Sequence, residues 1–272
     1  MSRSTAAKKG SLRTYASLTG EIFKVNLMSA AEYRTAFLMK VFGMVINDFA
    51  WLGLWVIFFA RFPQVNGWTV RDVMVLYAIG AANVGIVFAL MGGAITIARK
   101  ISRGEMDYFL TLPKNILWHI STSYTDIPAI GDVLFGILVL IFLVRPNAAE
   151  FGLFWLLTLI TSITIYSFIV LTQSIGFYVQ QFDDAAETMM WALIGFAMYP
   201  QVSFVGLLRV LTFTLIPAFF VSTLPVALLS GADLRYLIPL CAYAAALFAA
   251  AVFTFYHGLK RYESGNLISV KM

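Results

Sequence analysis

Charged residues are scarce in this sequence. Only 12% of its 272 residues are Asp, Glu, Lys or Arg, whereas 60% are hydrophobic, and the mean hydropathy is +0.83. Because about a quarter of the residues in soluble globular domains are charged, this composition excludes an ordinary soluble domain. The net charge of +5 does not indicate a nucleic-acid partner, since Lys and Arg in a membrane protein first mark the loops that stay in the cytoplasm.

Residues that hold metals or perform catalysis are equally rare. The one cysteine, Cys241, lies in an apolar run and is interpreted as a packing residue, because it has no second cysteine to pair with. The two histidines, His119 and His257, have no ligand-type neighbours in sequence. Neither a G-x-x-x-x-G-K-[ST] nucleotide-binding loop nor a G-x-S-x-G elbow occurs. We therefore predict that this chain is no enzyme and binds no metal or cofactor of its own.

Long apolar runs dominate what remains. A hydrocarbon core about 30 Å thick needs about 20 apolar residues in a helix. We therefore predict an all-α polytopic membrane protein with six transmembrane helices. The expected spans are residues 35–60, 73–98, 122–144, 151–179, 188–205 and 236–256. Residues 1–34 then form a cytoplasmic N-terminal region, 35–257 one transmembrane domain and 258–272 a cytoplasmic tail.

Prolines are expected to interrupt two of these segments. Pro128 is predicted to bend the third span. Between spans five and six, Pro217 and Pro225 divide the apolar stretch into pieces of about seven residues, too short to cross the core. This stretch is predicted to form a broken re-entrant hairpin on the external side. Arg209 at its start is interpreted as an anchor whose charged group reaches the headgroups, although attraction of an anionic substrate is an alternative.

The distribution of basic residues predicts the orientation. With six spans, both termini lie on one side of the membrane. If that side is cytoplasmic, fourteen of the 19 Lys and Arg residues lie inside, as the positive-inside rule requires. The five basic residues left outside are Arg61, Arg71, Arg145, Arg209 and Arg235.

The N-terminal region contains an amphipathic pattern. Its apolar side consists of Leu12, Tyr15, Leu18, Ile22, Phe23 and Val25, and its polar side of Arg13, Ser17, Gly20, Glu21 and Lys24. This pattern predicts a helix lying in the membrane interface, with packing against protein as the alternative. Because Glu21 and Lys24 interrupt the apolar run that a signal peptide needs, no cleaved signal is expected.

The polar segment between spans two and three is the most informative loop. Ser102 and Glu105 have the spacing of a capping box, which predicts the start of a short helix, and Pro113 is expected to end it. The apolar residues of this helix are Met106, Phe109 and Leu110. Such a helix suits docking onto a partner, and packing onto the protein's own membrane domain is the alternative.

Two carboxylates fall inside expected spans. Charge at membrane depth normally faces the bundle interior or a wet cavity. Asp48, beside Asn47, is interpreted as forming a structural hydrogen bond to a neighbouring helix. The alternative is that Asp48 is a titrating group on a transport pathway. Asp132 is expected to cap or kink the third span together with Asp126, or to pair with a lysine or arginine elsewhere.

Small residues recur at every fourth position of span two. They are Ala81, Gly85, Ala89 and Gly93. A stripe of this kind lets helix backbones approach closely, and the sequence leaves open whether the partner helix belongs to the same subunit.

The order of these features resembles the type-2 permeases of ATP-binding cassette (ABC) exporters. The likeness extends over nearly the whole chain. The stretches Gly104–Pro113, Ile127–Asp132 and Gly258–Asn266 are similar to a bacterial subfamily in which two related permeases act with a separate ATPase. The resemblance implies an exporter subunit in the bacterial cytoplasmic (inner) membrane.

The resemblance also implies partners and roles. Two copies of an ABC ATPase would carry ATP and Mg, and a second permease, identical or homologous, would complete the substrate pathway. The segment from Ser102 to Leu112 would be the coupling helix, Leu12 to Leu27 the connecting helix, and the hairpin with Arg209, Pro217 and Pro225 the external gate. The coupling residues would be Ser102, Arg103, Gly104, Glu105, Met106, Asp107, Tyr108, Phe109 and Leu110.

Two other functions fit the residues alone. An ion-coupled carrier could use Asp48 as its titrating group, but such carriers show internal symmetry and no clear inverted repeat is visible. The second alternative is a membrane assembly protein that contains no transport pathway. The sequence identifies neither the substrate nor the direction of transport.

Overall fold

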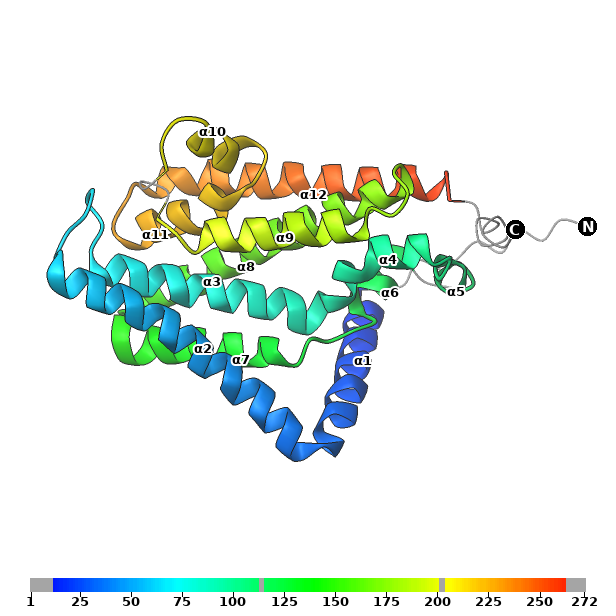
Figure 1. Ribbon diagram of the computed structural model, residues 1–272, viewed down its shortest axis with the longest axis horizontal. Coiled ribbons are helices and arrows are strands. Elements are labelled where there is room, and N and C mark those ends of the chain that lie inside the picture. Colours follow the sequence, from blue (N-terminus) through cyan, green and yellow to red (C-terminus); the bar gives the residue numbers. More distant parts are fainter. Residues whose placement is uncertain (1–11, 113–114, 201–203, 263–272) are drawn as a thin grey trace, which may run out of the picture.

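The computed structural model describes residues 12–112, 115–200 and 204–262, and within these ranges the chain is all-helical (Figure 1). Its helices are α1 Leu12–Glu32, α2 Arg34–Arg61, α3 Val70–Met91, α4 Ile97–Ser102, α5 Met106–Leu110, α6 Ile116–Thr122, α7 Pro128–Leu138, α8 Ala148–Gln173, α9 Asp183–Ala197, α10 Gly206–Thr214, α11 Leu224–Leu229 and α12 Leu237–Leu259. Three 3₁₀ segments, Gly92–Thr96, Ser174–Phe177 and Leu234–Tyr236, and two π-helical turns, Val139–Val144 and Phe219–Thr223, extend them.

Four helical segments of the described chain are long and apolar enough to cross a membrane. They are Arg34–Arg61, Val70–Ser102, Ala148–Phe177 and Leu234–Leu259. A bent pair, Gly206–Thr214 with Phe219–Leu229, would make a fifth if it is one span. The chain is therefore an integral multi-pass membrane protein. Helix length and composition support four or five spans, one or two fewer than the six expected from the sequence.

The third expected span begins later than residue 122. Ser123–Ile127 is not helical, and α7 starts at Pro128 before continuing as the π-helical turn Val139–Val144. Proline is favoured in the first turn of a helix because the N–H that it lacks has no partner there. Pro128 therefore starts this helix, and the expectation of a bend at Pro128 is wrong.

The fifth expected span, 188–205, is also displaced. Helix α9 begins at Asp183 and ends at Ala197, so its 15 residues extend about 22 Å, less than the thickness of the hydrocarbon core. Asp183 and Asp184 in its first turn interact favourably with the helix dipole, which explains the earlier start. Pro200 disfavours helical backbone just before it and explains the early end. Residues 201–203 lie outside the described ranges.

The expected hairpin is bent at one proline and not at the other. The axes of α10 and of segment Phe219–Leu229 differ by 72°, and Pro217 lies in the break between them. Pro225, in contrast, lies within the continuous helical segment, in the first turn of α11 after a π-helical turn. The missing N–H is tolerated at that position, so the expected break at Pro225 is wrong.

Glycines bring helix backbones into direct contact within the chain. A Cβ on Gly85 of α3 would lie 2.7 Å from the Ala129 carbonyl oxygen of α7, and one on Gly136 of α7 would lie 2.8 Å from the Ala78 carbonyl oxygen of α3. At the other end of the stripe, Gly93 packs on the Ile120 carbonyl of α6. The stripe of small residues in span two therefore serves packing inside this subunit.

Salt bridges connect the helices at both ends of the bundle. Arg71 at the start of α3 pairs with Glu150 of α8 at 3.1 Å, and Arg99 of α4 pairs with Glu187 of α9 at 3.6 Å. Exposed pairs like these contribute at most about 1 kcal/mol each. The second pair lies at the end of the bundle that also carries α5, the start of α1 and the end of α12 (Figure 1).

Helix α1 packs one side against the protein. The exposed residues Ser17, Gly20, Glu21 and Lys24 form the expected polar side. Val25, expected on the apolar side, is 63% exposed. The partly buried stripe continues instead through Asn26 and Leu27, because helical spacing places these residues, and not Val25, in line with Ile22 and Phe23. The side chains of Leu12 and Arg13 lie outside the described part.

Hydrogen bonds attach α1 to the loop region beside it. The Trp118 Nε1–H of α6 donates to Thr19 Oγ1 at 3.0 Å, and the Asn26 amide donates to Thr125 Oγ1 at 3.2 Å. The rings of Tyr15 and Trp118 meet edge to face with centroids 5.7 Å apart. These contacts favour the alternative that α1 packs on protein, at a steep angle to the bundle (Figure 1).

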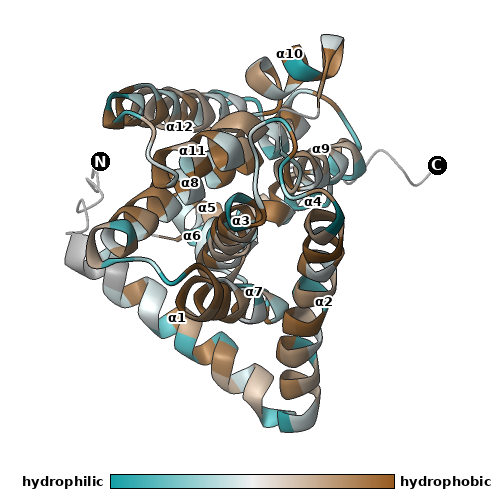
Figure 2. Ribbon diagram, turned by 90° about the vertical axis from the view of Figure 1, so that its left-hand side faces the viewer, coloured by the Kyte–Doolittle hydropathy of each residue, from teal (hydrophilic) through white to brown (hydrophobic). Residues whose placement is uncertain are grey.

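Helices α2 and α12 are rich in apolar residues (Figure 2), and many of these side chains are exposed in the described structure. On α2 the exposed large apolar side chains are Leu38, Met39, Phe42, Ile46, Phe49, Trp51, Leu54, Val56, Ile57 and Phe58. On α12 they are Ile238, Phe248 and Phe253. Such surfaces belong in lipid or against another membrane-embedded chain.

Candidate functional site

The expected coupling segment does not contain the predicted capping box. Ser102 is the last residue of α4, and its hydroxyl donates to the Arg99 carbonyl at 3.0 Å. Gly104 then turns the chain with a φ of 72°, a conformation that glycine adopts without strain. Helix α5 starts only at Met106, and Glu105 provides no side-chain cap. The capping-box prediction is therefore wrong, and Pro113 lies outside the described residues.

Helix α5 has a buried side and an exposed side. Met106 is fully buried and Phe109 is 6% exposed. The Phe109 ring meets the His119 ring at 5.9 Å, and Lys100 Nζ lies 5.6 Å from its centroid. Met106 and Phe109 therefore anchor α5 on the protein's own core.

Two large apolar residues of α5 remain available to a partner. Tyr108 is 64% exposed and Leu110 is 45% exposed. The exposed polar residues around them are Ser102, Arg103, Glu105 and Asp107. We call these six residues the α5 surface. It combines aromatic, aliphatic and charged groups at the tip of the bundle, a composition suited to protein contact.

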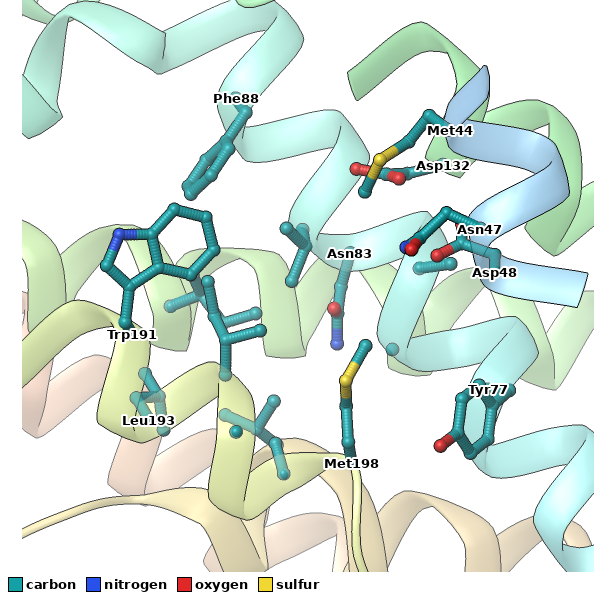
Figure 3. A pocket seen from close by; sticks show the side chains of 18 of the residues that line it. Met44, Asn47, Asp48, Tyr77, Asn83, Phe88, Asp132, Trp191, Leu193 and Met198 are labelled. Atoms are coloured by element: carbon teal, nitrogen blue, oxygen red, sulfur yellow. The ribbon is translucent and has the colours of Figure 1, made fainter. Parts of the chain in front are cut away.

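A cavity of about 300 Å³ opens between α2, α3, α7 and α9 (Figure 3). Its lining is mainly apolar, including Met44, Phe88, Trp191 and Met198. A smaller number of polar side chains line it as well: Asn47, Asp48, Asn83, Asp126 and Asp132. A mainly apolar pocket with a few convergent polar groups is the usual form of a small-molecule site.

The two intramembrane carboxylates meet in this cavity. Asp48 of α2 and Asp132 of α7 are 3% and 5% exposed, and their carboxyl groups lie within hydrogen-bonding reach of each other. Asp48 thus reaches a neighbouring helix, but its partner there is another acid. In the described part of the chain Asp132 forms no salt bridge with a lysine or arginine.

Asn83 of α3 also lines the cavity (Figure 3). Its side chain is fully buried, and its amide donates to Thr161 Oγ1 of α8 at 3.1 Å. The Ser162 hydroxyl lies 3.4 Å from the main-chain carbonyl oxygen of Asn83, but donates at a shorter 2.7 Å to the Thr158 carbonyl of its own helix. The bond to Thr161 holds α3 against α8 and fixes the direction of the Asn83 amide.

Replacing Asn83 or Thr161 by alanine tests this link. We expect a coupling free energy of about 0.5–2 kcal/mol between the two positions, the range for hydrogen bonds between membrane helices. The measurement is a double-mutant cycle in thermal unfolding of the detergent-purified protein. Additive effects of the two substitutions would show that the bond contributes nothing.

Asp126 lies in the loop before α7. Its carboxylate is 3.5 Å from the Tyr124 hydroxyl, which donates to it. Burial raises the pKa of Asp126, whereas the Tyr124 hydrogen bond and the positive charge of Lys40 lower it. Lys40 therefore compensates part of the charge at this edge of the cavity.

The residues of the expected gate lie apart from both sites. Arg209 is exposed on α10, towards the end of the bundle opposite α5, while Pro217 and Pro225 are buried. Only Val221, from the π-helical turn that follows Pro217, reaches the lining of the cavity.

Comparison with known proteins gives one finding. The model of a family described as "ABC-2 family transporter protein" matches residues 45–265. Searches of curated proteins and of solved structures gave no significant match. The matched range includes α5, Asp48, Asp132 and the hairpin.

Proposed function

This chain belongs to the ABC-2 family of transporter proteins and is a membrane permease of an ABC transporter, and we propose that it exports its substrate with energy from ATP hydrolysed on a separate ATPase. The resemblance found in the sequence and the family match agree on the family and on a membrane permease. No G-x-x-x-x-G-K-[ST] loop is present in the sequence, so nucleotide would bind to the partner.

The observation that carries the proposal is the α5 surface. Helix α5 follows α3 and α4, which form the long segment Val70–Ser102, and Met106 and Phe109 fix it to the core. A push on Tyr108 or Leu110 would therefore be transmitted to α3, the helix that contributes Asn83 to the cavity. Rigid, packed elements of this kind pass movement between sites because they change arrangement as units.

The proposed assembly has two ATPase subunits and two permeases. The exposed apolar sides of α2 and α12 offer surface for a second permease, identical or homologous. The α5 surface, the start of α1 and the end of α12 would face the cytoplasm, where both termini and the ATPase lie. The membrane would be the bacterial cytoplasmic membrane. ATP binding closes the two ATPase subunits and so favours one of two arrangements of the permeases.

The test is purification of the full chain from its native membrane in a mild detergent. We expect an ATPase with a G-x-x-x-x-G-K-[ST] loop to co-purify in a fixed ratio and to hydrolyse ATP. The opposite outcome is a chain that purifies without any ATPase and, reconstituted alone in vesicles, moves a solute uphill with an ion gradient. That outcome would assign the chain to ion-coupled transport.

A further inference from the structure

We propose that the cavity between α2, α3, α7 and α9 binds an organic cation with an apolar body, held by Asp48 and Asp132. The inference rests on the proposed function, for which it names the substrate class. It places the ligand among helices of a single chain.

The charge of the cavity lining favours a cationic ligand. Among the described residues, three carboxylates, Asp48, Asp126 and Asp132, line the cavity, and no lysine, arginine or histidine does. Lys40 lies near enough for its positive charge to lower the pKa of Asp126. In the described part of the chain neither Asp48 nor Asp132 forms a salt bridge with a basic residue. Two buried carboxyl groups within hydrogen-bonding reach of each other cannot both be ionised without a counter-charge. A bound cation would supply that counter-charge.

Buried oxygen atoms that lack a donor group are the second reason to expect a cation in the cavity. Among the described residues, Oδ1 of Asn83 is buried without a hydrogen-bond partner, and Oδ2 of Asp48 and Oδ1 of Asp132 are buried with no N–H or hydroxyl donor, so that each has only the neighbouring carboxyl group within reach. Buried polar atoms normally have partners, and leaving them unpaired costs free energy. All three side chains line the same cavity, where Figure 3 shows them on its walls. The site therefore presents acceptors and negative charge to whatever occupies it.

Aromatic rings define the apolar end of the ligand. Phe88 and Trp191 meet edge to face with centroids 6.3 Å apart, across the cavity from the two aspartates (Figure 3). Trp191 is 53% exposed, which places it at the rim, while Phe88 is 4% exposed. Aromatic faces attract organic cations as well as apolar groups.

Inorganic ions fit the site less well. Among the described residues no group of three or more His, Cys, Asp or Glu side chains could hold a metal ion. A volume of about 300 Å³ exceeds what a single ion needs and matches the lower limit of pockets for small organic ligands. A hydrated inorganic ion would make no favourable contact with the largely apolar lining.

The test is equilibrium binding of N-benzylisopropylamine, which is protonated at pH 7 and can donate N–H hydrogen bonds to the carboxyl and amide oxygens, to the full chain in lipid nanodiscs, compared with N-benzylacetamide. The second compound is neutral and has the same number of heavy atoms. We expect saturable binding of the cation and binding about tenfold or more weaker for the amide. Because this comparison uses the unmodified chain, it does not depend on any variant folding.

Three variants locate the site. Asp48→Asn and Asp132→Asn should each weaken cation binding about tenfold, whereas the matched exposed control Asp184→Asn should leave it unchanged. Size-exclusion profiles and unfolding temperatures check that each variant is folded. Equal affinity for the two probes, unchanged binding in both cavity variants, or binding of Na⁺ or Mg²⁺ in place of the organic cation would overturn the proposal.

The same preparation separates this proposal from the proposed function. Cation binding needs no ATPase, and co-purification of an ATPase needs no ligand. An ATPase partner without cation binding would overturn only the substrate class. Cation binding without an ATPase partner would overturn only the energy source.

Discussion

Replacing Tyr108 and Leu110 together by alanine is expected to abolish coupling between ATP hydrolysis and the permease. Both side chains are exposed on α5, so their loss removes contact surface and leaves the core unchanged. A central aromatic anchor of an interface contributes about 2 kcal/mol or more, so loss of the Tyr108 ring by itself should lower affinity for the ATPase at least about 30-fold, and loss of Leu110 should lower it further. The measurement is ATPase co-purification with the double variant, together with its hydrolysis rate.

Two control variants make this result specific. Tyr236→Ala removes an equally large tyrosine, 54% exposed, at the other end of the bundle and should retain the ATPase. Phe109→Ala removes a buried ring and should lower the free energy of unfolding by about 3–5 kcal/mol. Full association and coupling in the Tyr108→Ala/Leu110→Ala variant would exclude α5 as the docking site.

The second large effect is expected at Gly93. A methyl group there would overlap the Ile120 carbonyl oxygen of α6 and approach the Ser123 hydroxyl at 2.7 Å. Backbone cannot rotate away as a flexible side chain can, so Gly93→Ala should force α6 away from the 3₁₀ segment Gly92–Thr96 that follows α3. We expect a loss of about 3 kcal/mol in unfolding free energy, at the upper end of overpacking effects. The measurement is the unfolding temperature of the purified protein.

Gly80→Ala is the matched control on the same segment. A Cβ at Gly80 meets nothing within 4 Å, and alanine is the better helix former by up to about 1 kcal/mol. This variant should be as stable as the natural chain or slightly more stable. An equal loss of stability in both variants would show that the contact between Gly93 and Ile120 is unimportant.

Helix positions followed from hydrophobic pattern wherever one segment was long and continuous. α2 lies within one or two residues of the expected 35–60, and α8 with its 3₁₀ extension covers nearly all of 151–179. The predicted helix boundaries were wrong where a proline determines the boundary. Pro128 and Pro225 both occupy first turns of helices, where proline is tolerated, although spacing alone suggested breaks.

The sequence predicted some residues of the candidate sites but not how they come together. Asp48 and Asp132 stood out because charge in an apolar span is costly, but nothing in a linear pattern places α2 beside α7. Asn83 was overlooked, although a single amide in an uncharged span gives the same kind of signal. For α5, composition indicated a docking helix, whereas only packing shows that Phe109 faces the core and Tyr108 faces outward.

If a soluble ATPase drives this permease through α5, it must lie against Tyr108. A photo-crosslinking amino acid at position 108, compared with one at position 236, tests this contact in native membranes. We expect irradiation to attach an ATPase with a G-x-x-x-x-G-K-[ST] loop at position 108 and none at position 236. Attachment at position 236, or at neither position, would show that the ATPase does not dock on α5.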